Sequence, residues 1–180
     1  MTHTILVKNK IAAQDNAYLN RSFTSGSNMD NGWVFNLQSQ YTTDGYTEVW
    51  EAVQPTTASL IGLWMAASPE VVETTSGNSK YRGIDPDPRN FYTAASSVGD
   101  AFKPMPGDII TLTADALDSS TPSAFANAGV DSHEFTWAAN PGATTTMSLR
   151  YLATTYISVG SGSAIGNQRV EAFKFEVLQN

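Results

Sequence analysis

The sequence predicts a mainly β protein: a single antiparallel β-barrel or β-sandwich domain with long loops and an N-terminal arm. Three observations lead to this fold class: short runs of alternating apolar and polar residues, turn-forming residues between these runs, and almost no apolar spacing of the helical kind. A chain of 180 residues suits one ordinary domain. We therefore assign residues 1–30 to the arm and residues 31–180 to the β domain.

The clearest predicted strand is residues 109–113, which follow a turn rich in Pro and Gly. Pro106 and Gly107 favour a turn directly before it, because proline cannot continue a regular element and glycine permits unusual backbone angles. The strand itself carries isoleucine, leucine and threonine, which suit a half-buried pleated surface. We expect Ile110 and Leu112 on one face.

The first half of the chain predicts an arm followed by a hairpin. Residues 2–7 alternate weakly, and the polar stretch after them predicts an extended segment with little core of its own. Residues 33–38 and 46–53 alternate clearly, so we expect them to pair as a hairpin. The apolar run 58–67 fits either a buried strand or a short buried helix.

The second half predicts two long loops and three strands. Residues 68–99 are dense in Pro, Gly, Asn, Asp and Ser and predict a long shaped loop, a kind of loop that is often functional or bound to a partner. Residues 118–129 predict another loop and residues 133–137 a short strand. Residues 149–159 and 169–178 predict long strands, the last with one solvated face. The expected core is Trp33, Phe35, Trp50, Leu63, Ile110, Leu112, Tyr151, Phe173 and Phe175.

Composition limits the classes of partner. The formal net charge is −7, from 17 acidic and 10 basic residues, and the basic residues are scattered. We therefore expect no nucleic-acid partner and no membrane partner. The cysteine count is zero, which excludes disulfides and thiolate metal sites. The N-terminal apolar run is too short for a signal peptide, so we expect synthesis in the cytoplasm.

The two histidines, His3 and His133, do not predict an active site. A zinc site needs several nitrogen or sulfur ligands, and a serine nucleophile needs a base and an orienting group. Neither pattern surrounds these residues, and the G-x-S-x-G elbow of α/β-hydrolases is absent from the sequence. We expect His133 to be an ordinary strand residue, and we expect no catalytic residues.

Asp85 and Asp87 form the best candidate carboxylate pair. Each precedes a proline, so turn formation explains both, and Arg82 and Arg89 are close enough in sequence to neutralise them. The spacing of a calcium-binding loop is absent. We therefore expect no metal site, no cofactor and no enzymatic activity.

The tryptophans offer a second kind of binding site. Aromatic faces can stack on sugar rings, but these tryptophans lie in predicted strands beside other apolar residues, so we expect them in the core or in a subunit interface. A carbohydrate-binding β-sandwich stays as an alternative. The residues concerned are Trp33, Trp50, Trp64 and Trp137.

Four runs of the sequence carry a resemblance to a known group of proteins. They are EVWEAVQPTTA (48–58), GLWMAASPEVV (62–72), KYRGIDPDPRNF (80–91) and DAFKPMPGDIITLTADAL (100–117). Together they resemble small virion structural proteins of tailed bacteriophages, above all the head decoration or cement proteins. The resemblance implies a β-rich, non-enzymatic protein on the capsid surface of the virion, oligomeric around a symmetry axis, with the major capsid protein as its partner.

We therefore expect a capsid decoration protein, a homo-oligomer that stabilises the outside of a phage head. A phage tail or neck structural protein is the alternative within the same class. Apolar residues of the arm are spaced to add a strand to another surface, and the long loop offers charged and aromatic contacts. The expected partner-binding residues are Ile5, Leu6, Val7, Ile11, Tyr81, Arg82, Asp85, Asp87 and Arg89. An edge strand of its own sheet is the other interpretation of the arm.

Overall fold

The computed structural model describes residues 3–40, 48–56, 60–70, 72–76, 79–83, 88–117, 127–131, 133–136, 147–159 and 168–180. Within these ranges the chain is mainly β, as the sequence predicts. None of the described helices is long and apolar enough to cross a membrane. They are 3-10 turns of three residues each: η1 (Ala12–Gln14), η2 (Ala17–Leu19), η3 (Pro88–Asn90) and η4 (Ala114–Ala116).

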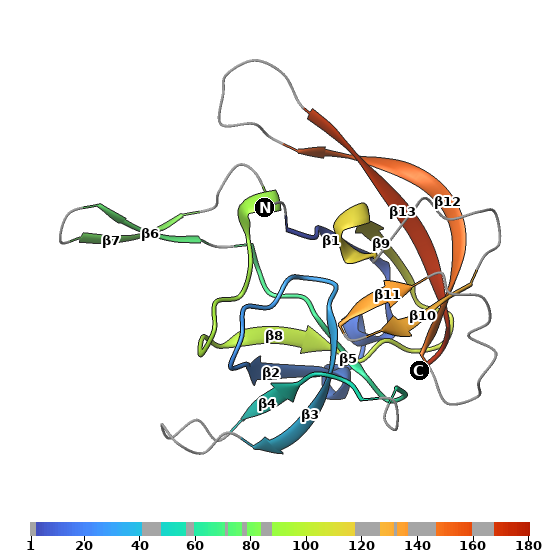
Figure 1. The fold of residues 1–180 in the computed structure, drawn as a ribbon, viewed down its shortest axis with the longest axis horizontal. Coiled ribbons are helices and arrows are strands. Elements are labelled where there is room, and N and C mark those ends of the chain that lie inside the picture. The colour runs from blue at the N-terminus through green and yellow to red at the C-terminus, as the bar shows by residue number, and fades with distance from the viewer. Residues whose placement is uncertain are drawn as a thin grey trace.

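Five strands close a barrel in the order β2-β4-β3-β5-β8, in the lower part of Figure 1. β2 and β4 run parallel, and the other neighbours run antiparallel. The pairing of β3 with β4 confirms the predicted hairpin, and the ambiguous apolar run contributes a short strand, β5. The barrel strands are β2 (Asn20–Thr24), β3 (Val34–Gln40), β4 (Val49–Val53), β5 (Trp64–Ala66) and β8 (Gly99–Phe102).

A fully antiparallel sheet lies beside the barrel, with strand order β1-β9-β13-β12-β10-β11. The predicted strands in the second half of the chain are confirmed, and β10 occupies the end of a segment predicted to be a loop. The sheet strands are β1 (Leu6–Lys10), β9 (Ile109–Thr113), β10 (Asn127–Asp131), β11 (Glu134–Thr136), β12 (Ser148–Val159) and β13 (Gln168–Gln179).

The strands β12 and β13 extend past the rest of the sheet. β13 pairs with β9 only over residues 172–176, and β12 pairs with β10 only over residues 148–150. Beyond these positions residues 156–159 of β12 pair with residues 168–171 of β13 and with no third described strand. We call these eight residues the ribbon end, which projects at the top of Figure 1.

Two clusters of buried side chains form the core. The larger one packs the barrel against the sheet, and the smaller one fills the barrel, where the rings of Phe23 and Phe35 lie 4.7 Å apart. Of the expected core, Trp33 and Trp50 are only half-buried. The others are buried as predicted: Phe35, Leu63, Ile110, Leu112, Tyr151, Phe173 and Phe175.

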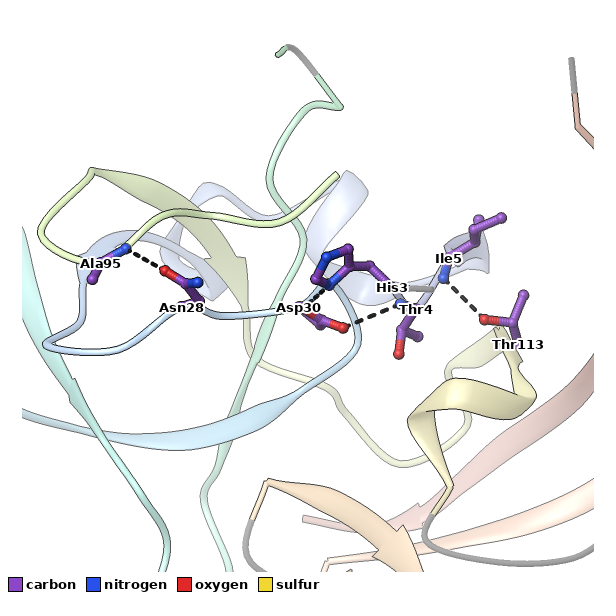
Figure 2. A network of polar contacts seen from close by, with 7 residues as sticks. All are labelled: His3, Thr4, Ile5, Asn28, Asp30, Ala95 and Thr113. Atoms are coloured by element: carbon purple, nitrogen blue, oxygen red, sulfur yellow. Dashed lines mark hydrogen bonds and ion pairs between the residues drawn. The ribbon is translucent and has the colours of Figure 1, made fainter. Parts of the chain in front are cut away.

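The N-terminal segment is part of the domain, so the expectation of a separate arm with little core is wrong. β1 pairs antiparallel with β9, and Ile5 is only 3% exposed. Figure 2 shows the polar contacts that fix the segment: Asp30 accepts one hydrogen bond from the Thr4 backbone N–H and lies 2.8 Å from His3 Nδ1, and the Ile5 N–H donates to Thr113 Oγ1. The edge-strand interpretation is the one that this pairing supports.

The expected long loop of residues 68–99 contains a hairpin. β6 (Val72–Ser76) pairs with β7 (Ser79–Gly83), and the hairpin projects to the left in Figure 1. Threonines in β6 favour extended backbone, and only two residues separate the strands, which is the shortest common hairpin connection. The prediction of a continuous loop was wrong because polar composition does not exclude a strand.

Candidate functional site

A cleft of about 600 Å³ lies between the edge strand β1 and the barrel strands β2, β4 and β8. This volume falls in the range of small-molecule sites, about 300–1,000 Å³. We call it the barrel cleft. The residues that line it are Lys8, Asn20, Arg21, Ser22, Glu48, Trp50, Ala67, Pro69, Asp100, Ala101 and Phe102.

One tryptophan supplies the large aromatic surface of the barrel cleft. Trp50 lies in β4 and is half-buried, so part of its indole stays accessible. Ala101 and Phe102 of β8 also line the cleft, but they are almost fully buried, which leaves Trp50 as its large accessible apolar group. The cleft therefore offers an apolar surface for a ligand ring.

Arg21 of β2 is held in place by two contacts. Its guanidinium carbon lies 5.7 Å from the centroid of the Trp64 ring, which is the geometry of a cation–π contact. Its Nη1 donates a 2.9 Å hydrogen bond to the backbone carbonyl of Asn20. Because these contacts already orient the side chain of Arg21, which lines the cleft, binding a ligand beside it costs little further side-chain entropy.

The charges around the barrel cleft are balanced. Glu48 and Asp100 bring two carboxylates, and Lys8 and Arg21 bring two cations. Asp100 faces Ser22 across the β2–β8 pairing, and the Ser22 hydroxyl donates to Asp100 Oδ1 over a long 3.4 Å. This arrangement places hydrogen-bond donors and acceptors together with no net formal charge.

The acidic residue next to the cleft is partly buried. Glu70 follows Pro69, which lines the cleft, and burial raises the pKa of the Glu70 carboxyl above its usual range.

The residues predicted to bind a partner through the N-terminal segment differ in how deeply they are buried. Ile5 and Ile11 are buried in the protein's own core at 3% and 5% exposure, so they are not available to a partner. Leu6 and Val7 are half-buried in β1, where they pair with β9 residues. The prediction of an apolar anchor fails because these side chains complete the sheet to which they belong.

The predicted residues of the long segment are also dispersed. Tyr81 and Arg82 lie in β7, of which the backbone is described, whereas Asp85 and Asp87 lie outside the described residues. Arg89 lies in η3, and its Nη2 donates a 2.8 Å hydrogen bond to Gln168 Oε1. Among these residues Arg89 thus has a defined place, beside the first residue of β13.

Both histidines support the fold. The His133 ring stacks on Trp33 at 5.3 Å with an interplanar angle of 4°, and its Nδ1 lies 2.9 Å from the Val34 carbonyl. His3 contacts Asp30 and the ring of Tyr92. In the part of the chain that the structure describes, no group of three His, Asp or Glu side chains could hold a metal ion.

Sequence reasoning missed the barrel cleft as a site. Trp50 is one of four tryptophans in the sequence, and Arg21, Asp100 and Lys8 belong to no local motif. The four residues come together only when the barrel has closed and β1 of the sheet lies beside it. Comparison of the chain with models of protein families, with curated proteins and with solved structures gives no match.

Proposed function

We propose that this protein is a non-enzymatic virion structural protein that binds and stabilises the outside of a phage capsid. Its partner is the major capsid protein, and several copies act together on the capsid surface. The resemblance of four sequence runs to phage decoration proteins supports this function. The structural observation that supports it best is the ribbon end, which projects at the top of Figure 1 with strand edges that pair with no third described strand and with five of its eight residues exposed.

The ribbon end has the features of a surface that adds a strand from a partner. The pairs that join Tyr156 to Glu171 and Ile157 to Val170 have no third described strand on either side. Backbone N–H and C=O groups on such an edge can pair with an extended segment of another protein. A capsid lattice offers many copies of one such segment, so weak single contacts add up to firm attachment.

Side chains at the ribbon end add an aromatic contact point. Tyr156 is 52% exposed, and the Arg169 guanidinium carbon lies 4.9 Å from its ring centroid. An exposed tyrosine next to an arginine is a composition enriched in protein interfaces. Arg89, one of the residues predicted to bind the partner, donates a hydrogen bond to Gln168 of the ribbon end. The segment predicted to be a long loop therefore contacts the ribbon end through Arg89.

Co-sedimentation with empty capsids tests this function. The protein should pellet with capsids, and Tyr156→Asp should lower the bound fraction strongly because it places a charge in the contact. Tyr18→Ala is the matched control, since Tyr18 is 82% exposed on η2, away from the ribbon end. Protein that stays in the supernatant, or that binds purified tails or necks instead of heads, would contradict attachment to capsids.

A further inference from the structure

We infer that the barrel cleft binds a neutral saccharide. This activity uses a surface other than the ribbon end and does not depend on capsid attachment. The inference rests on four properties of the cleft: its volume, its accessible tryptophan, its balanced charges and its pre-oriented arginine.

The aromatic wall suits a sugar ring. One face of a pyranose carries C–H groups, and such a face packs on an indole while the hydroxyls at the ring edge stay in reach of polar groups. Trp50 lines the cleft and is half-buried, so it is supported by the barrel and still accessible. Of the three tryptophans that the structure describes, Trp50 lines the cleft and Trp33 and Trp64 do not, which assigns the sugar contact to Trp50 among them.

The polar groups match a ligand that both donates and accepts hydrogen bonds. Hydroxyls can donate to the carboxylates of Glu48 and Asp100 and accept from Arg21. Asp100 is exposed, and its contact with Ser22 is long at 3.4 Å, so its oxygens keep acceptor capacity for a ligand. Asn20 and Ser22 add acceptor oxygens, whereas the Asn20 Nδ2 group already donates to the carbonyls of Ala13 and Asn16.

The charge balance selects against ionic ligands. An anion in the cleft would lie near Glu48 and Asp100, and a cation would lie near Lys8 and Arg21. Each would meet opposite charges as well as like charges, so it would gain no net Coulomb attraction and would still lose hydration, which disfavours binding. A neutral hydroxyl-rich ring avoids this penalty, and Arg21 needs no reordering because Trp64 and the Asn20 carbonyl already hold it.

A glycan array followed by titration of the best neutral oligosaccharide tests the inference. The array should include neutral hexose and N-acetylhexosamine oligomers, sialylated and sulfated glycans, and the titration should be followed by NMR shifts of the tryptophan indole N–H groups. We expect neutral glycans to bind, with the Trp50 indole shifting. Trp50→Ala should weaken binding by about tenfold or more, as expected for an aromatic residue at the centre of a site.

A second variant keeps the test valid if Trp50→Ala fails to fold. Asp100→Asn changes an exposed side chain, so it should keep the melting temperature and still weaken glycan binding several-fold. Tyr156→Asp should bind glycans like the unmodified protein, and Trp50→Ala should still pellet with capsids if folded, so the two proposals fail independently. Binding only to charged glycans, no binding to any glycan, or unchanged affinity in both cleft variants would overturn the assignment.

Discussion

The Asp108 carboxylate accepts a 2.8 Å hydrogen bond from the backbone N–H of Ala12, although 96 positions separate the two residues. Its other oxygen accepts from the Met105 N–H, also at 2.8 Å, and Asp108 is only 4% exposed. One buried carboxylate therefore fixes the end of β1 against the turn that starts β9.

Asp108→Ala should lower the free energy of unfolding by about 3–6 kcal/mol, because hydrogen bonds to a charged group contribute about 1.5–3 kcal/mol each and two N–H groups lose their partner. Urea denaturation followed by tryptophan fluorescence measures this change. Asp15→Ala is the control, since Asp15 is exposed next to η1. Equal stability of the two variants would show that water replaces the carboxylate.

Gly32 should not tolerate a side chain. Its φ is +88°, and a Cβ at this position would lie 2.6 Å from Leu112 Cδ2, in the core between barrel and sheet. Gly32→Ala should therefore cost about 2–4 kcal/mol from backbone strain and overpacking together. Gly26→Ala is the matched control, because no atom lies within 4 Å of its Cβ position. A Gly32→Ala protein as stable as the control would contradict this packing.

Glu70 should make stability fall as pH rises. Burial raises its pKa, so the folded state holds this proton more tightly than the unfolded chain does. This stabilising contribution of Glu70 is fully present below the pKa that Glu70 has in the unfolded chain. It is lost as the pH rises through the higher pKa that Glu70 has in the folded state. Glu70→Gln should thus match the unmodified protein near about pH 4 and exceed its stability near about pH 7. Urea midpoints at both pH values, with exposed Glu51→Gln as control, measure the difference; parallel pH profiles would refute it.

Deletion of residues 1–10 should destabilise the isolated protein. The deletion removes β1, leaves the edge of β9 unpaired and takes Ile5 out of the core. We expect the melting temperature to fall by at least about 5 °C, since each 1 kcal/mol shifts it by about 2–4 °C at this size. Differential scanning calorimetry measures the shift, and Lys8→Ala, at an exposed position of β1, should leave it nearly unchanged. An unaltered melting temperature after deletion would mean that β1 adds little to the stability of the protein.

The strands that could be predicted are those whose own residues alternate clearly. β9, β12 and β13 carry this signal, and Phe173 and Phe175 fall on the predicted buried face. Alternation shows on which face of a strand a side chain lies, but it does not show whether the rest of the protein covers that face. Trp50 was therefore expected in the core, although the barrel leaves it at a cleft.

The parts that could not be predicted depend on contacts between distant segments. The sequence leaves β1 open between an arm and an edge strand because three of its five residues are polar, and only its pairing with β9 decides for the strand. The barrel cleft needs Arg21 of β2, Trp50 of β4 and Asp100 of β8 to come together, and no local pattern links them. The hairpin of β6 and β7 is polar, so its composition resembles that of a loop.

The pairing of Leu6 with Leu112 determines the order in which the barrel and the sheet can form during translation. All barrel strands have been translated once Phe102 leaves the ribosome, so the barrel can close early. β1 cannot pair until β9, about 100 residues later in the chain, has been synthesised. At about 5–20 residues per second, this delays the pairing by roughly 5–20 s. During that interval β1 has no partner strand among the described strands already made. Its charged residues Lys8 and Lys10 then protect an open strand from pairing with other chains.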